Sequence, residues 1–312
     1  MQPILALQID PLDTLNLQTD TSLMLALEAQ HRGYRVFSYQ PQQLAFDSGK
    51  ITARGLWIHV MEDGDNIYTQ VDSEGELNLN KASIVLMRQD PPFNERYLAN
   101  TYLLEQLDPH VRVLNSPKGI RNACEKTLPL LFPDLIPPTL ITEDVVKIEE
   151  FAQKHEKIVL KPLFGHGGND VFALERSKYK EIPSLFSFFK DKSPAPIIVQ
   201  SFLEEIVQGD KRIIMIDGDV IGGFRRVPQK GDIRSNLAQG GRAEPCELSA
   251  RDIEICKKIG STLHEMGLYL AGIDVIGDYL IEVNVTSPTG LRILKRLYSI
   301  DAAKMFFDKL EM

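Results

Sequence analysis

Short apolar runs alternate with an amphipathic stretch through the first third of the chain. The runs predict strands at 4–9, 35–39 and 83–87, and the amphipathic stretch predicts a helix over 21–32. Asp20 or Thr21 can cap the start of this helix, and Gly33 can end it in a left-handed conformation. A strand–helix–strand order predicts a parallel sheet with helices packed on it. Ligands of such sheets bind at the carboxyl ends of the strands, where Asp10 and Arg88 lie.

The pattern changes after residue 115. Turn-forming residues between 115 and 140 predict a boundary between two parts of the chain. A helix over 143–155 and a strand over 158–161 are expected next. Near the end of the chain, Ser249 and Asp252 have the spacing of a capping box, and Gly267 ends the helical periodicity that follows them.

The most informative stretch is a predicted hairpin whose apolar strands carry polar side chains. Asp274 lies in the first strand, and Glu282 and Asn284 lie in the second, so the latter two point to one face. A buried charge is costly unless something pairs with it. Hard oxygen ligands on rigid strands suit Mg²⁺, which takes one or two carboxylates and leaves its other positions to water and phosphate. The alternative is a solvated hairpin with a polar outer face.

The parity of this hairpin gives a sharper prediction. With a two-residue turn at 277–278, Asp274 would pair with Ile281 and face away from Glu282. The two carboxylates share a face only if the loop has an odd length, such as 277–279, or if one strand contains a β-bulge. We therefore predict one of these two arrangements.

A glycine-rich loop follows the strand that ends at Lys161. Gly165, Gly167 and Gly168 lie between two predicted strands, whereas a Walker loop or a Rossmann fingerprint opens a helix. Bare backbone N–H groups in such a loop can contact phosphate, with Lys161 adding a charge. The alternative is a merely flexible connection. Lys126 offers a second ammonium group, unless it is an ordinary solvated lysine.

Three further segments have two possible readings each. The stretch 197–203 is either a core strand or a strand whose linker reads an adenine edge. Asp210 could accept a ribose hydroxyl or simply hold Arg212. The basic stretch 225–242 offers bidentate donors for carboxylate or phosphate, or forms a flexible surface loop.

Composition narrows the class of protein. A chain of 312 residues favours two or three domains, and the formal charge of −8 argues against a nucleic-acid partner. Cys124, Cys246 and Cys256 are too few and too scattered for a disulfide framework or a zinc site, which favours a reducing cytoplasm. The amino-terminal residues lack signal-peptide features, and no apolar run is long enough to span a bilayer, so we expect no membrane partner.

Taken together and in order, these motifs resemble the prokaryotic type of glutathione synthetase, a member of the ATP-grasp ligases. The motifs are Asp10-Pro11, Arg88-Gln-Asp-Pro-Pro-Phe93, Asn115-Ser-Pro, Glu125-Lys126, Lys161-Pro-x-x-Gly-x-Gly-Gly168, Gly209-Asp-Lys-Arg212, Arg234-x-Asn236-x-x-x-Gly-Gly-Arg242 and Asp274…Glu282-Val-Asn284. The resemblance implies an α/β amino-terminal domain, Rossmann-like with a parallel sheet, followed by an ATP-grasp fold of two α+β subdomains. The implied limits are 1–121 for a substrate-binding domain, 122–203 for a lid subdomain with the glycine loop, and 204–312 for a subdomain with the metal site.

The same resemblance implies an ATP-dependent ligation of γ-glutamylcysteine and glycine through an acyl phosphate. It implies Mg²⁺ (or Mn²⁺) as the cofactor, a cytoplasmic location and a homo-oligomer, a tetramer by the habit of the family. ATP contacts are implied for Lys126, Lys161, Gly165, Gly167, Gly168, Gln200, Ser201, Phe202, Leu203 and Asp210. Substrate contacts are implied for Arg88, Asp90, Arg226, Arg234, Asn236, Gly241 and Arg292, metal ligation for Asp274, Glu282 and Asn284, and catalysis for Arg212, Arg234 and Lys161.

The glycine loop departs from the family pattern at one position. Phe164 stands where the family usually carries Asp, so the hydrogen bonds by which an Asp could pin the loop are lost. Two alternatives to glutathione synthetase follow from the motifs: another ATP-grasp ligase, such as a D-alanine–D-alanine ligase or a peptide-tailoring glutamate ligase, and a non-catalytic nucleotide-binding module. The 88–93 motif and the arginine set favour the first reading over another ligase, and the retained Asp274, Glu282 and Asn284 argue against the non-catalytic module.

Overall fold

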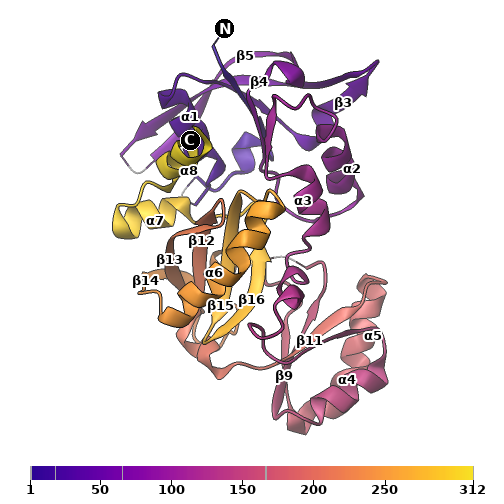
Figure 1. Ribbon diagram of the computed structural model, residues 1–312. Helices are drawn as coiled ribbons and strands as arrows, with labels where there is room; N and C mark the ends of the chain where they lie inside the picture. Colours follow the sequence, from indigo (N-terminus) through magenta and orange to yellow (C-terminus); the bar gives the residue numbers. More distant parts are fainter. Residues whose placement is uncertain (1, 18, 65, 166, 312) are drawn as a thin grey trace.

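The chain folds around three β-sheets, which a computed structural model describes for residues 2–17, 19–64, 66–165 and 167–311. Figure 1 shows the third sheet, formed by residues 210–284, between the first sheet and a smaller sheet formed by residues 139–201. The eight α-helices of the described residues are α1 (Ser22–His31), α2 (Glu95–Leu104), α3 (Pro117–Asn122), α4 (Val145–Ala152), α5 (Ile182–Lys192), α6 (Ala250–Glu265), α7 (Leu291–Tyr298) and α8 (Ala302–Glu311).

The first sheet has seven strands, and its centre is parallel, as the sequence predicts for the strands at 4–9, 35–39 and 83–87. Its order is β3-β4-β2-β1-β6-β7, with β5 paired to β4. The strands are β1 (Ile4–Gln8), β2 (Arg35–Tyr39), β3 (Leu44–Asp47), β4 (Lys50–Asp63), β5 (Asn66–Asn78), β6 (Ile84–Met87) and β7 (Arg112–Leu114). β1 pairs in parallel with β2 and β6, whereas β3, β4 and β5 add an antiparallel extension that the sequence analysis missed.

The second sheet is a four-stranded antiparallel sheet that carries the glycine loop. Its order is β10-β9-β11-β8, formed by β8 (Thr139–Thr142), β9 (Lys157–Pro162), β10 (Phe172–Glu175) and β11 (Ile197–Ser201). The glycine loop joins β9 to its antiparallel partner β10, so the predicted strand–loop–strand arrangement is confirmed.

The third sheet is antiparallel and holds the predicted hairpin. Its order is β14-β13-β12-β15-β16, formed by β12 (Asp210–Ile216), β13 (Asp219–Val227), β14 (Arg242–Pro245), β15 (Leu270–Ile276) and β16 (Tyr279–Asn284). The capping box that begins α6 is present, with the Ser249 side chain accepting from Asp252 N and the Asp252 side chain accepting from Ser249 N. The N-cap residue of α1 is Thr21, and the side chain that accepts a backbone N–H of the first turn is the preceding Asp20, whose carboxylate accepts the Leu23 N–H at 2.7 Å.

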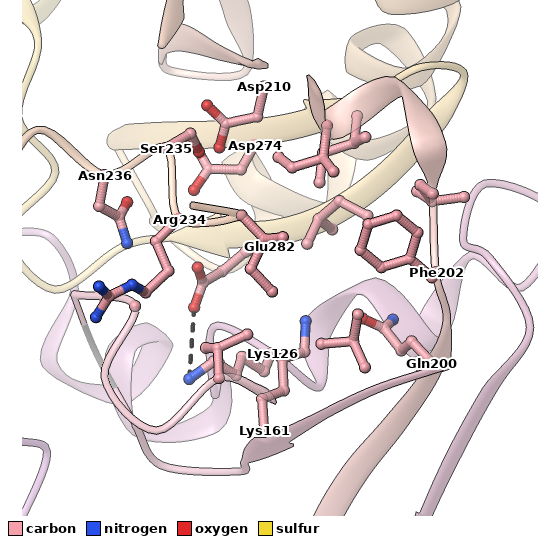
Figure 2. Close-up of a pocket in the computed structure, with 18 of the residues that line it drawn as sticks. Lys126, Lys161, Gln200, Phe202, Asp210, Arg234, Ser235, Asn236, Asp274 and Glu282 are labelled. Atoms are coloured by element: carbon pink, nitrogen blue, oxygen red, sulfur yellow. Dashed lines mark ion pairs between the residues drawn. The ribbon is translucent and has the colours of Figure 1, made fainter. Parts of the chain in front are cut away.

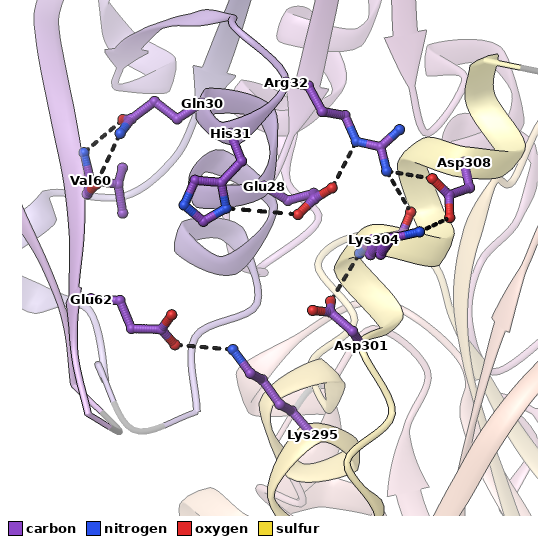
Figure 3. Close-up of polar contacts among 10 residues, drawn as sticks. All are labelled: Glu28, Gln30, His31, Arg32, Val60, Glu62, Lys295, Asp301, Lys304 and Asp308. Carbon is purple, nitrogen blue, oxygen red and sulfur yellow. Dashed lines mark hydrogen bonds and ion pairs between the residues drawn. The ribbon is translucent and has the colours of Figure 1, made fainter.

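The last two helices return to the first sheet. Figure 1 shows α8 beside α1, and one apolar cluster joins strands of the first and third sheets to α1, α7 and α8. Arg32, the C-cap residue of α1, forms ion pairs with Asp308 and Glu311 of α8 and with Glu28 of α1. Lys295 of α7 pairs with Glu62 of β4 at 3.0 Å (Figure 3). The predicted limits at 121 and 203 stay predictions, but the structure ties the carboxyl-terminal residues to the amino-terminal sheet.

Candidate active site

A cleft lies between the second and third sheets, and most of the predicted site residues line it. Figure 2 shows Lys126 and Lys161 on one side of this cleft, facing Asp210, Asp274 and Glu282 on the other. The predicted residues that line it are Lys126, Lys161, Gly165, Gly167, Gly168, Gln200, Ser201, Phe202, Leu203, Asp210, Arg226, Arg234, Asn236, Asp274 and Glu282.

Strand register explains why the acidic side chains meet. Arg212 of β12 lies opposite Asp274 of β15, which lies opposite Glu282 of β16, so one row crosses three strands. The register shifts next to Asp274, where Val275 pairs with Leu280 and leaves Ile281 as an extra residue. Of the two predicted arrangements, the structure therefore has the bulge and not the odd loop, since the turn at 277–278 has two residues. Ile281 and Glu282 both line the cleft, because a bulge re-aims side chains that would otherwise alternate.

Four buried charged side chains of the third sheet are joined by hydrogen bonds and ion pairs beside the cleft. Arg212 donates to both oxygens of Asp274, at 2.6 and 3.1 Å. Arg226 lies 3.0 Å from Asp274 and also pairs with both oxygens of Asp210. Asp210 therefore holds Arg226, and the alternative that it holds Arg212 is wrong. Burial opposes ionisation of Asp274, but Arg212 and Arg226 together lower its pKa to about 2.

The two lysines add positive charge on the opposite wall. The Lys126 ammonium lies 3.9 Å from a Glu282 carboxylate oxygen and also donates to the Gly165 carbonyl. Burial, only partly offset by Glu282, lowers the pKa of Lys161 to about 8. Burial, together with Asp274 and Glu125, raises the pKa of Glu282 against the opposing effect of the lysines. The arrangement suits a ligand that brings several negative charges between the lysines and the carboxylates.

The glycine loop covers one edge of the cleft. Gly167 and Gly168 have φ angles of +65° and +77°, a conformation that favours glycine. A Cβ added at Gly168 would lie 3.0 Å from the Asn236 amide nitrogen, so the loop passes close to the basic stretch. His166, also in this loop, lies outside the described residues. The loop thus brings backbone groups and Asn236 to the same edge of the cleft.

The other end of the cleft is apolar, and the sequence analysis missed this part. Its side chains are those of ordinary core positions: Pro137, Val159, Val171, Ile206, Ile233, Ile276 and Ile281. They line the same cleft as the segment 200–203 at the end of β11, which the sequence predicted as an adenine contact. An apolar slot beside a short stretch of accessible backbone is suited to a flat heterocyclic ring.

Six predicted site residues do not line the cleft. They are Arg88, Asp90, Arg212, Gly241, Asn284 and Arg292. Arg212 and Asn284 reach it indirectly, since both side chains donate to Asp274. Arg88 is only 5% exposed and donates to Ser22 Oγ and the Pro288 carbonyl, so its donors are used within the protein. The roles predicted for all six stay predictions.

The other three lie outside the cleft lining. Asp90 follows β6, and its backbone N–H donates to Asp10 at 2.7 Å. Gly241 packs against the backbone that carries Asn236, since an added Cβ would lie 2.1 Å from the Ser235 carbonyl. Arg292 lies in the first turn of α7.

Within the described residues, no group of three or more His, Cys, Asp or Glu side chains is placed to hold a metal ion. The predicted metal set differs from such a group, because it contains two carboxylates and the Asn284 amide. All three cysteines are free thiols. In the part of the chain that the structure describes, no helix combines the length and apolar character needed to cross a membrane.

Models of known protein families match both halves of the chain. The prokaryotic glutathione synthetase N-terminal domain matches residues 4–121, and the prokaryotic glutathione synthetase ATP-grasp domain matches residues 125–299. The chain is 42% identical over 307 residues to the glutathione synthetase of Mesorhizobium japonicum, covering 98% of this chain and 97% of that protein. It is 35% identical over 309 residues to the glutathione synthetase of Vibrio vulnificus, covering 98% and 96%.

Solved structures support the fold independently. The D-cycloserine synthetase DcsG superposes with a TM-score of 0.69 at 14% identity, covering 98% of each chain. The ATP-grasp ligase PsnB superposes with a TM-score of 0.64 at 19% identity, covering 100% of this chain and 99% of that one. Together with the lysines, the glycine loop and the carboxylate row on one cleft, these matches show that the chain belongs to the prokaryotic glutathione synthetase family of ATP-dependent, ATP-grasp ligases.

Proposed function

We propose that the cleft between the second and third sheets joins γ-glutamylcysteine to glycine at the expense of ATP. The observation that carries this proposal is the bulged carboxylate row facing two lysines, because it provides for a polyphosphate and a divalent cation together. The relatives that match the whole chain are named glutathione synthetases. A carboxylate and an amine are therefore the substrates, and glutathione, ADP and phosphate are the products.

ATP would lie along the cleft with its base at the apolar end. The backbone of 200–203 would hydrogen-bond the adenine edge between Val159 and Ile276, and Asp210 would contact the ribose. Lys126 and Lys161 would bind the phosphates, with the glycine loop closing over them. Closure matters because an acyl phosphate hydrolyses when water reaches it.

The metal set fits Mg²⁺ in the type of its donors. Two carboxylates and an amide meet on adjacent strands, and Mg²⁺ characteristically combines one or two carboxylates with phosphate oxygens. Glu282 is the better placed of the two carboxylates, since both oxygens of Asp274 already accept from arginine. Asp274, Glu282 and Asn284 would hold Mg²⁺, or Mn²⁺, whose charge would neutralise that of the phosphate oxygens.

The chemistry needs no side-chain nucleophile. A cysteinyl carboxylate oxygen attacks the γ-phosphorus of ATP, and the bond to ADP breaks. The glycine amine then attacks the acyl carbon, an amide bond forms, and phosphate leaves. Arg226, Arg234 and Asn236 would orient the carboxylate and the transferred phosphoryl oxygens at the edge of the cleft, while Arg212 acts through Asp274. Catalysis is then mainly positioning and electrostatic stabilisation.

We extend the proposal to the organisation of the protein. The division into 1–121, 122–203 and 204–312 agrees with one sheet in each part, although α8 packs on the first. Assembly into a tetramer and location in the cytoplasm stay predictions from family resemblance and cysteine content.

A substrate-omission series tests the proposed reaction. ADP release is measured with γ-glutamylcysteine alone, glycine alone and both, and the product is identified by mass spectrometry. We expect ADP release to require both substrates and to match glutathione formation. ADP release with another amine, such as D-alanine, in place of glycine would indicate a different ATP-grasp ligase. Tight ATP binding without turnover would indicate a non-catalytic module.

A further inference from the structure

The residue next to Lys126 makes an unusual set of contacts with the metal-binding strand. A single oxygen of Glu125, Oε1, accepts from Val285 N at 2.8 Å, Thr286 N at 3.0 Å and Thr286 Oγ1 at 2.9 Å. The Glu125 carbonyl also accepts from Val283 N at 3.0 Å. The donors are on both sides of Asn284, and the first of them, Val283, directly follows Glu282. Glu125 therefore binds the backbone around two of the three predicted metal ligands.

Strand topology shows what these contacts replace. β16 is the edge strand of its sheet, so the N–H groups that point away from β15 have no strand to pair with. Leu280 N donates outward to the Leu135 carbonyl, and Val283 N and Val285 N donate outward to Glu125. Outward N–H groups recur every second residue in a regular strand. The three-residue step from 280 to 283 is the bulge, since Ile281 is the extra residue.

The contacts of Glu125 therefore match the N–H groups that point outward in the bulged register of β16. Without the bulge, the outward N–H groups would be those of Glu282 and Asn284, and their side chains would change faces. The charge of the carboxylate strengthens all three bonds to Oε1. Residues beyond 286 are held by other groups, with Arg88 donating to the Pro288 carbonyl and Arg212 to the Thr289 carbonyl.

We propose that Glu125 is a positioning residue, which fixes the bulged register of β16 and so turns Glu282 and Asn284 toward Asp274. Because Glu125 is adjacent to Lys126, the same turn also sets the ammonium that lies 3.9 Å from Glu282. The inference rests on the proposed function only in assigning the metal to these three residues.

Four variants test the proposal. Glu125→Ala removes all side-chain acceptors, Glu125→Gln keeps the Oε1 acceptor without the charge, and Thr286→Val removes one of the three donors. Glu150→Ala is the matched control, since Glu150 is an exposed glutamate of α4 paired with Lys147. Two measurements are made on the full chain: amide hydrogen exchange of the peptide covering 283–286 without metal or nucleotide, and Mn²⁺ binding in the presence of a non-hydrolysable ATP analogue, followed by electron paramagnetic resonance.

For Glu125→Ala we expect exchange at 283–286 to rise at least about tenfold and Mn²⁺ affinity to fall about tenfold, the lower end for residues that orient metal ligands. Glu125→Gln should recover most of both, Thr286→Val should fall between, and Glu150→Ala should match the wild type. Unchanged Mn²⁺ affinity and exchange in Glu125→Ala would overturn the proposal. So would a Glu125→Gln variant as impaired as Glu125→Ala, because the charge alone would then be responsible.

The outcome is separable from that of the proposed function. If the wild type makes no glutathione but the exchange and Mn²⁺ effects are found, the positioning role stands and the proposed reaction fails. If the wild type makes glutathione and Glu125→Ala binds Mn²⁺ normally, only the positioning role fails. If Glu125→Ala does not fold, exchange and Mn²⁺ affinity are compared in Thr286→Val and Glu125→Gln. The proposal expects the larger change in Thr286→Val, and wild-type values in both variants would overturn it.

Discussion

Replacing Arg212 by methionine probes the buried charges at the centre of the cleft. Arg212 and Asp274 side chains are only 8% and 6% exposed, and two hydrogen bonds of 2.6 and 3.1 Å join them. Arg212, Arg226, Asp210 and Asp274 have a formal charge sum of zero, which the substitution changes to −1. Methionine keeps much of the side-chain volume, so the effect reports mainly on charge and hydrogen bonding.

Two routes give the size of the effect. A pKa of about 2 for Asp274, against an ordinary 3.8, corresponds to roughly 2–3 kcal/mol in favour of the ionised form. Removing one partner of a buried ion pair costs about 3–5 kcal/mol, because the other charge is left behind. Arg226 still lies 3.0 Å from Asp274 and softens the loss. We therefore expect Arg212→Met to lower the free energy of unfolding by about 3 kcal/mol at pH 7.

Urea unfolding followed by circular dichroism measures this difference, with Asp274→Asn and the double variant completing a cycle. Because the folded pKa of Asp274 is depressed, its contribution is present above pH 3.8 and is lost as the pH falls toward 2. The deficit of Arg212→Met should therefore shrink over that window. A loss below about 1 kcal/mol, or strictly additive losses in the double variant, would refute the reasoning.

Four other predictions follow from the same geometry. Glu282→Ala should abolish Mg²⁺-dependent ADP release while urea unfolding stays cooperative, and a fully active variant would contradict the metal assignment. Because burial lowers the pKa of Lys161 to about 8, kcat/KM for ATP should fall above that pH, and Lys161→Arg should move the fall upward. Phe164 is 55% exposed and lines a space together with Phe93, so Phe164→Ala, which removes the ring from that space, should raise the ratio of ADP to glutathione, whereas Phe164→Leu should not. Arg32→Ala should cost about 1–2 kcal/mol of stability by thermal unfolding, with activity retained in the folded protein.

Local patterns were sufficient to predict much of the fold. Apolar runs located β1, β2 and β6, and spacing alone identified the capping box at Ser249. Parity predicted either an odd loop or a bulge if the two carboxylates share a face, and the structure shows the bulge, at Ile281. The β4–β5 hairpin was missed, although Gly64 lies at its turn, because β5 is mostly exposed and lacks a strong apolar alternation.

The sequence did not predict contacts between strands that are far apart in the chain. Asp210 pairs with Arg226 rather than Arg212 because β12 and β13 align those two residues, a register that no local signal encodes. The apolar end of the cleft was invisible for a different reason: residues such as Val159 and Ile276 have the pattern of core positions, and only the fold shows that they face a cleft. Arg88 shows the reverse, a charged residue that resembled a ligand contact but is buried.

The most direct test of the proposed reaction follows an oxygen atom. γ-Glutamylcysteine labelled with ¹⁸O in its cysteinyl carboxylate is incubated with ATP, glycine, Mg²⁺ and the enzyme, and the released phosphate is analysed by mass spectrometry. If that carboxylate attacks the γ-phosphorus, each phosphate carries one ¹⁸O atom and one glutathione forms per phosphate. Phosphate without ¹⁸O, released alongside ADP, would contradict the proposal that this cleft activates the cysteinyl carboxylate.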